Sequence, residues 1–502
     1  MATNLMTGLT ALLTPLNFFY MAIGTVLGIL AGAVPGLSAT MAISLLVPVT
    51  FVMKPLSGLA MLAGIYNGGM FGGSISAILF NVPGAASAAV TVFDGHPMTA
   101  KGQSARALQL AVLASFTGGT LSVIALLLLA PALARVVLLF GPAEYFWVAI
   151  FGISIVISLS SGSMIKGILS GLLGLAVAQI GMDPVTAYPR FTFGNIYLAG
   201  GLQLTAVLLG MFSVPEAIDL MVKKALKGRT EELTSTEKVR LFSCFRPYWI
   251  DYLLSSVIGI VIGIIPAAGG NIASFVSYDV AKKRSSHPEA FGTGIPEGII
   301  ASEAANNACT GGSFVPLLTM GIPGSPASAA IMGAFMVHGL VLGPQLLTGN
   351  PDIVYGLMWA MFITNFIMLF AGFYGAQIFR RALSLQKEVL GPLILMFCIL
   401  GVYSMRGYMF DVIVMLVIGI IVYFMRKFKY SPAAFILGFI LSSLMEKNLL
   451  RTLKINENRI SGFFNSPLSW LMIVLTVLSV AGPFVIDYLK KKNNIEFVGG
   501  DE

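Results

Sequence analysis

Long apolar runs separated by short polar segments dominate this chain. Between Met1 and Phe93 the only charged side chain is Lys54, and residues 304–351 contain no Asp, Glu, Lys or Arg. A helix that crosses a bilayer needs about 20 mostly apolar residues. The pattern therefore predicts an all-α polytopic membrane protein with about 10–14 spans, some of them broken or re-entrant hairpins.

Pro and Gly interrupt several of the expected spans. We expect breaks at Val34-Pro35-Gly36, Pro83-Gly84, Ile265-Pro266 and Pro323-Gly324. In lipid, interrupted backbone is tolerated only where protein or a water-filled cavity satisfies the freed polar groups. The predicted segments are 16–34, 36–53, a hairpin over 60–93, 107–130, 143–161, 165–182, 195–221, 252–278, 295–310, a hairpin over 311–338, 353–379, 389–405, 408–425, 430–445 and 467–488.

Two halves of the chain carry the same pattern. Gly72–Gly95 (GGSISAILFNVPGAASAAVTVFDG) is similar to Gly311–Gly339 (GGSFVPLLTMGIPGSPASAAIMGAFMVHG), and the central prolines Pro83 and Pro323 are 240 positions apart (323 − 83 = 240). GILAGAVPGLSATMAIS and GIVIGIIPAAGGNIASF also match. Broken apolar segments at corresponding places in two halves are typical of secondary transporters. Chance similarity between Gly/Ala-rich helices is the alternative.

The polar stretch 222–247 separates these halves and predicts the domain organisation. We expect a first membrane repeat at 1–221 with its hairpin at 60–100, and a cytoplasmic linker at 222–247. A second membrane repeat follows at 248–489 with its hairpin at 311–344, and a cytoplasmic tail at 490–502 closes the chain.

The charge balance bears on topology. The chain has 30 Lys and Arg against 22 Asp and Glu, but these cations lie between apolar spans, as the positive-inside rule expects, and do not indicate nucleic acid. The first hairpin exits at Lys101 and Arg106, whereas the second exits across 339–351, which has no cation. The two repeats are therefore expected to have inverted topology. The basic residues Lys447, Arg451, Lys454 and Arg459 do not fit this orientation well.

The hairpin breaks are the candidate substrate site. Each break exposes backbone N–H groups at the N-terminus of a half-helix, where the helix dipole favours an anion such as a carboxylate. Packing of small residues against neighbouring helices is the alternative explanation. The candidate substrate-binding residues are Ser74, Pro83, Gly84, Ser87, Ser313, Pro323, Gly324, Ser325 and Ser328.

A second set of residues is the candidate for ion coupling. The side-chain oxygens of Asn67, Asn306 and Asn307 could ligate a cation, and interhelical hydrogen bonding is the alternative. Glu297 and Glu303 lie in an apolar segment, where a carboxylate suggests coupling to H⁺ or Na⁺; Glu303 is the candidate, and an interfacial position is the alternative for Glu297. Neither a nucleotide-binding GxxxxGK[ST] loop, nor a metal-ligand cluster, nor a nucleophile–base pair is visible, so we expect no metal site and no enzyme activity.

The segments AGAVPGLSATMAI, NVPGAASAAVTVFDGHPMTAKGQSARAL and PEGIIASEAANNACTGGSFVPLLTMGIPGSPASAAIMGAFMVHGLVLGP resemble the large membrane subunit of the tripartite tricarboxylate transporters. The resemblance covers the chain from about Ile23 to Leu489. One departure is Ala267 after Pro266, where the first half has Gly36 after Pro35. It weakens the expectation that both of these breaks bind a ligand.

The resemblance implies a function. It implies a multi-pass protein of the bacterial inner membrane that imports a di- or tricarboxylate such as citrate. Import would be driven by a gradient of Na⁺ or H⁺, with no other cofactor. The implied partners are a small four-span membrane subunit and a periplasmic solute-binding protein that delivers the substrate. The alternative is a stand-alone carboxylate permease or an anion channel without a binding protein.

Overall fold

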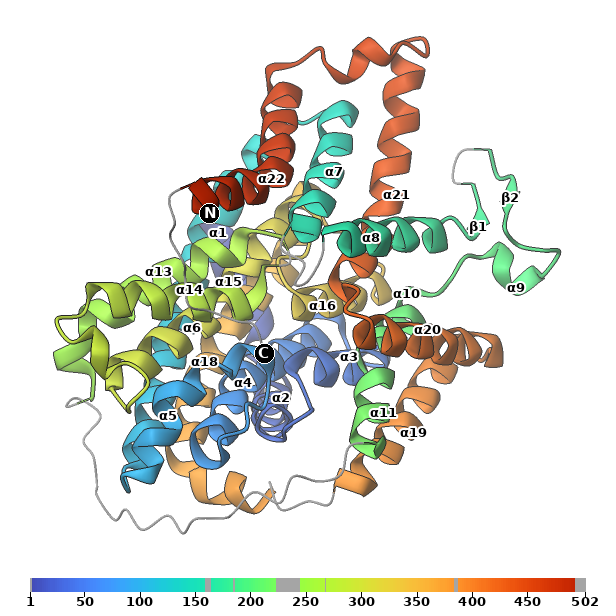
Figure 1. Cartoon of the computed structure of the whole chain (residues 1–502). Helices are drawn as coiled ribbons and strands as arrows, with labels where there is room; N and C mark the ends of the chain where they lie inside the picture. The colour runs from blue at the N-terminus through green and yellow to red at the C-terminus, as the bar shows by residue number, and fades with distance from the viewer. Residues whose placement is uncertain are drawn as a thin grey trace. The chain divides into compact units, whose positions relative to one another are not determined.

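The chain folds almost entirely into helices (Figure 1). The computed structural model describes residues 2–158, 164–183, 186–222, 244–266, 268–382 and 387–492. Within these ranges the sheet consists of one pair of two-residue strands, and seven helices are long and apolar enough to cross a bilayer. The expectation of an all-α polytopic membrane protein is confirmed.

The residues group into two compact units. The first unit contains Met1–Val137 and Gln203–Tyr423, and the second contains Leu138–Leu202 and Phe424–Glu502. Each unit therefore takes residues from both predicted halves. Residues 223–243 of the predicted linker and 493–502 of the predicted tail lie outside the described residues.

The second helix of the first unit, Pro15–Ala33, ends at a Pro-Gly break. Thr14 caps its start by accepting a hydrogen bond from the amide of Asn17 at 3.2 Å. The helix ends just before Pro35, and Gly36 has a φ of +95°, which favours glycine. The elements of this repeat are α1 (Ala2–Leu12), α2 (Pro15–Ala33), α3 (Ala39–Thr50), α4 (Pro55–Phe80), η1 (Ala86–Ala88), α5 (Thr91–Ala100) and α6 (Ser104–Val137).

The part of the second predicted repeat that corresponds to these elements lies in the same unit. Its elements are η2 (Arg246–Tyr248), α13 (Trp249–Ile264), α14 (Gly269–Arg284), η3 (Pro288–Ala290), α15 (Pro296–Met320), α16 (Pro326–Val337), α17 (Pro344–Gly349) and α18 (Pro351–Ala382). Figure 1 shows α13, α14 and α15 next to one another, as their contacts require. A residue with left-handed backbone conformation follows each of the two hairpin helices. It is Asn81 (φ 57°) after α4 and Gly321 (φ 72°) after α15.

Two of the predicted boundaries are wrong. The segments predicted separately as 295–310 and the start of a hairpin at 311 form the single helix α15. Gly311 lies inside it because α6 passes close by: a Cβ on Gly311 would lie 2.5 Å from Ser122 Oγ. The predicted span at 195–221 is divided into α9 (Ile196–Ala199), α10 (Leu204–Phe212) and α11 (Val214–Val222). Turn residues around Gly201 separate the first two.

Glycine contacts show that the two repeats fold alike. A Cβ on Gly28 would lie 2.4 Å from the carbonyl oxygen of Ile65, and a Cβ on Gly259 would lie 2.3 Å from that of Ala305. At these points the backbone of α2 lies so close to that of α4, and the backbone of α13 so close to that of α15, that only glycine fits. Gly28 and Gly259 are 231 positions apart, as are Pro35 and Pro266 of the matching breaks. Ile65 and Ala305 are 240 positions apart, as are Pro83 and Pro323.

The hairpin turns are held in the same way. The amide of Gly84 donates to the carbonyl oxygen of Gly73 at 3.2 Å, and the amide of Gly324 donates to that of Ser313 at 3.4 Å. Both pairs are 240 positions apart, so the structure pairs Gly73, not Ser74, with Ser313. The alignment of the two GGS motifs is therefore shifted by one residue.

The two repeats pack against each other. The helix α6 that follows the first hairpin packs along α15 of the second repeat, and α18 that follows the second hairpin packs along α4 and α6. The apolar core between them includes Phe71, Leu110, Ile299 and Met368. A second apolar cluster joins α3 to α10, α11, α19 (Lys387–Arg406) and α20 (Met409–Lys427).

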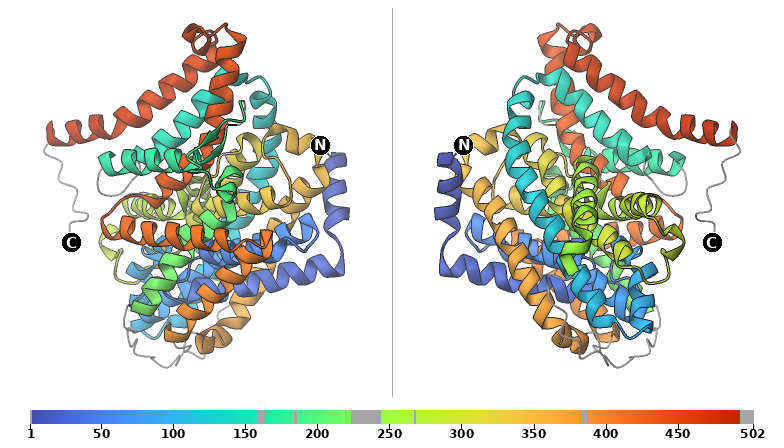
Figure 2. Two further views of the ribbon diagram at one scale, coloured as in Figure 1. Left: turned by 90° about the vertical axis from the view of Figure 1, so that its right-hand side faces the viewer. Right: turned by 90° about the vertical axis from the view of Figure 1, so that its left-hand side faces the viewer.

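The second unit is a smaller helical bundle with one short hairpin. Its helices α8 and α21 approach closely, because a Cβ on Gly174 would lie 2.0 Å from the carbonyl oxygen of Phe435. Figure 2 shows α21 and α22 joined at one end through the segment that contains η4. Its elements are α7 (Pro142–Ser158), α8 (Met164–Ala178), β1 (Gly181–Met182), β2 (Pro189–Arg190), α9, α21 (Pro432–Ile455), η4 (Ile460–Phe463) and α22 (Pro467–Lys492).

Candidate functional site

Buried polar side chains gather where the two hairpins of the first unit are anchored. Tyr66, on α4 of the first repeat, places its hydroxyl 2.8 Å from Ser325 Oγ and 3.3 Å from Ser313 Oγ. Ser325 is the N-cap of α16, so the first repeat reaches the tip of the second hairpin. All three residues are buried.

The tip of the second hairpin satisfies its own amides. Ser325 Oγ accepts from the amide of Ser328 at 3.1 Å, and Ser328 Oγ accepts from the amide of Ser325 at 2.9 Å. This reciprocal capping box, together with the bond from Gly324 to Ser313, holds the turn that follows Pro323. The amides predicted to be free at this break are therefore engaged within the hairpin.

The first hairpin is also held by local bonds. The amide of Gly84, next to Pro83, is bonded to Gly73, and Ser74 Oγ donates to the carbonyl oxygen of Phe71 at 2.7 Å. Ser74 thus bonds back to its own helix. Ser87 is buried at the end of the turn, next to the start of α14.

Two of the candidate asparagines, Asn67 and Asn307, form hydrogen bonds to neighbouring helices. Asn67 Nδ2 donates to the carbonyl oxygen of Met361 at 3.0 Å and to Thr364 Oγ1 at 2.9 Å. Asn307 Nδ2 lies 3.4 Å from the carbonyl oxygen of Asn67. Both side chains are fully buried, and neither Oδ1 has a hydrogen-bond partner among the described residues.

The third asparagine faces a different helix. Asn306 Nδ2 donates to the carbonyl oxygen of Met70 at 3.1 Å, and its Oδ1 has no partner among the described residues. A Cβ on Gly270 would lie 2.3 Å from this Oδ1 and 3.4 Å from Ser87 Cβ. Asn306 therefore points at the start of α14 and is directed away from the α18 side, where Asn67 is bonded.

Glu303 is a fully buried carboxylate one turn before these asparagines. Thr91 Oγ1 donates to its Oε1, and Ser115 Oγ donates to its Oε2 at 3.2 Å. In the described ranges no Lys, Arg or His forms an ion pair with it. An uncompensated charge in such a place is unfavourable, so this carboxyl group is suited to hold a proton or a cation.

Asp94, at the end of the first hairpin, is held in a cradle of backbone amides. Its Oδ1 accepts from the amides of Gly292, Gly294 and Ile295 at 2.8–3.0 Å, and its Oδ2 accepts from the hydroxyl of Tyr278 at 2.8 Å. The loop before α15 forms this cradle because both glycines have positive φ. Asp94 thus fastens the first hairpin to the second repeat.

We expect Asp94→Ala to lower the stability of the protein markedly. The substitution removes the acceptor of three backbone N–H groups, and each bond to a charged group contributes about 1.5–3 kcal/mol. The apparent melting temperature of the purified protein in detergent measures the effect. Asp279→Ala is the control, because Asp279 makes an exposed i,i+4 pair with Lys283. Equal melting temperatures for the two variants would contradict this role.

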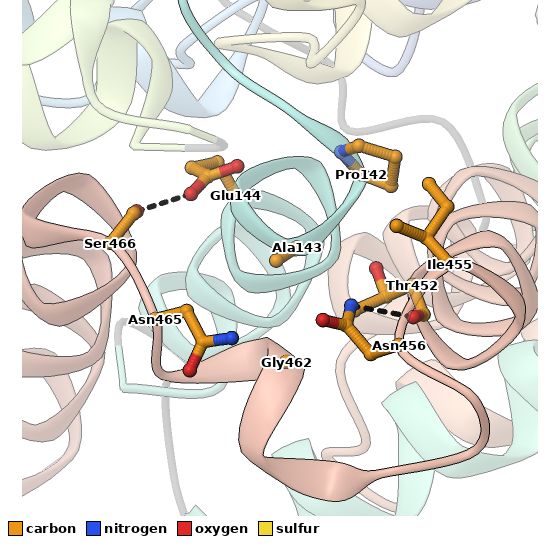
Figure 3. A pocket seen from close by; sticks show the side chains of 9 residues that line it. All are labelled: Pro142, Ala143, Glu144, Thr452, Ile455, Asn456, Gly462, Asn465 and Ser466. Atoms are coloured by element: carbon orange, nitrogen blue, oxygen red, sulfur yellow. Dashed lines mark hydrogen bonds between the residues drawn. The ribbon is translucent and has the colours of Figure 1, made fainter.

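A cavity of about 200 Å³ lies in the second unit, at the start of α7 (Figure 3). Glu144 lines it and accepts hydrogen bonds from Ser466 Oγ, from Ser469 Oγ at 2.9 Å and from the amide of Gly141 at 2.8 Å. These bonds cap the start of α22 and fix the chain before α7, so the carboxylate serves the packing of this unit. The candidate site is accordingly in the first unit.

Sequence reasoning missed several residues of this centre. Tyr66 and Ser115 stand outside the repeated motifs, and Thr91 stands inside one of them. The hydrogen-bond partners of all three are distant in the sequence, so the motifs gave no sign of their roles. An offset of 240 positions between equivalent residues of the two repeats could have indicated Tyr66. It pairs Asn307 with Asn67 and Asn306 with Tyr66 (306 − 66 = 240), so both members of the second pair face the partner repeat.

The duplicated broken helices and the buried polar centre define an all-α polytopic membrane protein built on an internal repeat. Residues 18–437 match the model of the tripartite tricarboxylate transporter TctA family, and the chain belongs to that family. It is thus a subunit of a tripartite tricarboxylate transporter, as its motifs suggested.

Two relatives come from Agrobacterium vitis. An uncharacterized 52.8 kDa protein in the TAR-I ttuC' 3'region is 34% identical over 505 residues, which cover 99% of both chains. An uncharacterized protein in the TAR-II ttuC' 3'region is 33% identical over 243 residues, which cover 48% of this chain and 100% of the relative. No solved structure matches this chain.

Proposed function

We propose that this chain forms the transport pathway of a secondary importer for a di- or tricarboxylate such as citrate, in the inner membrane of a bacterium. Uptake is driven by a gradient of Na⁺ or H⁺. A small four-span membrane subunit and a periplasmic solute-binding protein that delivers the substrate complete the system. The observation that supports this most is the set of buried, unpartnered asparagine oxygens beside two glycine-fastened hairpins.

In this proposal the two hairpin tips and the helices behind them surround the substrate. Neutral donors suit an anion that must bind and then leave, since a buried Arg would hold it more tightly. The residues proposed to line or shape this site are Ser74, Pro83, Gly84, Ser87, Ser313, Pro323, Gly324, Ser325 and Ser328. Their inverted arrangement would let one hairpin close as the other opens.

The coupling ion is proposed to bind next to these hairpins. Asn67, Asn306 and Asn307 each have an amide nitrogen engaged and an amide oxygen without a partner among the described residues. Hard cations prefer oxygen ligands of this kind. Glu303 adds the one fully buried carboxylate of α15.

Reconstituted uptake tests this proposal. Proteoliposomes that contain the chain and its four-span partner should accumulate radiolabelled citrate, tartrate or succinate only with the binding protein present and with an imposed Na⁺ or H⁺ gradient. Ionophores that collapse the gradient should abolish accumulation. Uptake that persists without a gradient would refute the secondary-transport proposal. Full uptake without the binding protein would favour the stand-alone permease or channel.

A further inference from the structure

The N-termini of the broken helices are not alike in the two repeats. In the first repeat α3 begins with Ser38, whose side chain accepts from the amide of Met41 at 3.2 Å. In the second repeat the corresponding helix α14 begins at Ala268, which cannot cap, and no side chain caps it among the described residues. The first amides of a helix have no partner within the helix. The first amides of α14 therefore have no side-chain cap.

The start of α14 lies between the two hairpins. A Cβ on Gly270 would lie 3.4 Å from Ser87 Cβ of the first hairpin, and a Cβ on Gly269 would lie 3.8 Å from Pro326 Cδ of the second. Gly269 has a φ of +64°, which turns the chain into the helix without a side chain. Because both residues are glycine, no side chain of their own separates this part of the backbone from the two hairpins, and Asn306 Oδ1 and Met70 Cε lie closest to the Cβ position of Gly270.

A second observation points to a ligand at this place. Asn306 is fully buried, and its Oδ1 is directed at Gly270 without a hydrogen-bond partner among the described residues. A buried acceptor without a donor is unfavourable by about 1–3 kcal/mol, so the arrangement favours a positive group next to it. Hard metal cations such as Na⁺ prefer oxygen ligands of this kind.

We propose that α14 provides the carboxylate subsite of the transporter. One carboxylate of the substrate binds at the N-terminal amides of α14, at Gly269 and Gly270, and a Na⁺ ion ligated by Asn306 Oδ1 pairs with that carboxylate. The helix dipole favours the anion, and the cation keeps the amide oxygen and the carboxylate from repelling each other. This inference rests on the proposed transport function, and it places the substrate carboxylate and the coupling ion next to each other at the start of α14.

The subsite explains how the ion and the substrate would depend on each other. Neither ligand alone matches the site, because the carboxylate alone would face the unpartnered oxygen of Asn306 and the cation alone would face the positive end of a helix. Together they satisfy both groups. Binding of either one should therefore raise the affinity for the other by the same factor.

Citrate binding to the assembled membrane complex tests the subsite. With radiolabelled citrate as the probe, we expect the Kd of the unaltered complex to fall at least tenfold when NaCl replaces KCl at constant pH. Asn306→Ala should remove this dependence, so that the Kd in Na⁺ equals the Kd in K⁺. Gly270→Ala should weaken binding at least tenfold in both salts, because its Cβ would occupy the space next to Asn306 and Ser87.

Matched controls separate binding from folding. Asn365→Ala removes another buried asparagine whose Oδ1 has no partner among the described residues, but this one faces Gly119 of α6. Gly349→Ala adds a Cβ that meets no atom within 4 Å. Both should keep the Na⁺ dependence. If Gly270→Ala does not yield folded protein, Asn306→Ala alone decides.

Three results would overturn the subsite. The first is an equal Kd for citrate in Na⁺ and K⁺ in the unaltered complex. The second is an undiminished Na⁺ dependence of the Kd in Asn306→Ala. The third is a Kd of folded Gly270→Ala within twofold of that of the unaltered complex. If the unaltered complex takes up citrate under a gradient and any of these holds, only the subsite is wrong. If it takes up none of the tested carboxylates, the proposed function itself is wrong.

Discussion

Glu303→Gln is expected to leave the protein folded and to reduce gradient-driven uptake of the carboxylate at least a hundredfold. Gln has nearly the same shape, and its oxygen can still accept from Thr91 while its amide nitrogen donates to Ser115. What the variant loses is the ability to gain and release a charge. A fully buried carboxyl group with only hydroxyl partners among the described residues is suited to that exchange.

The experiment compares two modes of transport in the same proteoliposomes. Net uptake under an imposed Na⁺ or H⁺ gradient should fail in Glu303→Gln, whereas exchange of labelled for unlabelled substrate should continue, because exchange needs no net movement of the ion. Glu297→Gln is the control on the same helix and should retain both modes. Gradient-driven uptake by Glu303→Gln at the level of the unaltered protein would remove Glu303 from the coupling mechanism.

Several features of the fold could be predicted from the sequence because they depend on local chemistry. The absence of charge up to Phe93, apart from Lys54, requires membrane helices. The breaks after Val34 and Asn81 lie at Pro-Gly pairs, and Pro and Gly have the lowest helix propensities of all residues. The family motifs lie at these same places.

The contacts of the site could not be predicted in this way. Thr91 and Glu303 are 212 positions apart, and their bond depends on how α5 meets α15. The one-residue shift between the GGS motifs is likewise visible only in the hydrogen-bond partners of Gly84 and Gly324. The sequence alone aligns the two motifs by their identical residues, Ser74 with Ser313, whereas the structure pairs Gly73 with Ser313. Sequence periodicity likewise did not reveal that α1 is a helix separate from α2.

The differences between the repeats are as informative as the likeness. The offset of 240 pairs Glu303 with Ala63 and Asn306 with Tyr66, and the cap Ser38 of α3 has no counterpart at the start of α14. The second repeat thus carries Glu303, Asn306 and the helix start without a side-chain cap. The first repeat supplies hydroxyl groups, Tyr66 and Thr91, that bond to the second. Duplication gives a symmetric scaffold on which the polar groups are placed asymmetrically.

Gly84→Ala and Gly324→Ala should each prevent most of the protein from reaching its folded state. A Cβ on Gly84 would lie 2.1 Å from the carbonyl oxygen of Gly32, and a Cβ on Gly324 would lie 2.4 Å from that of Gly263. These neighbours are backbone atoms and cannot turn aside, as the end of a side chain could. Overpacking typically costs about 1–3 kcal/mol, and a backbone clash at a hairpin anchor belongs at the upper end or beyond.

The yield of monodisperse protein from membranes and its melting temperature in detergent provide the measurement. Gly349→Ala again serves as the control and should behave like the unaltered protein, since its Cβ meets no atom within 4 Å. Because the two hairpins are anchored in the same way, both variants are expected to lower the yield and the melting temperature. Normal folding of either variant would mean that the close approach of its hairpin to α2 or α13 is not required. The shared anchoring of the two hairpins would then no longer explain why glycine follows proline at both breaks.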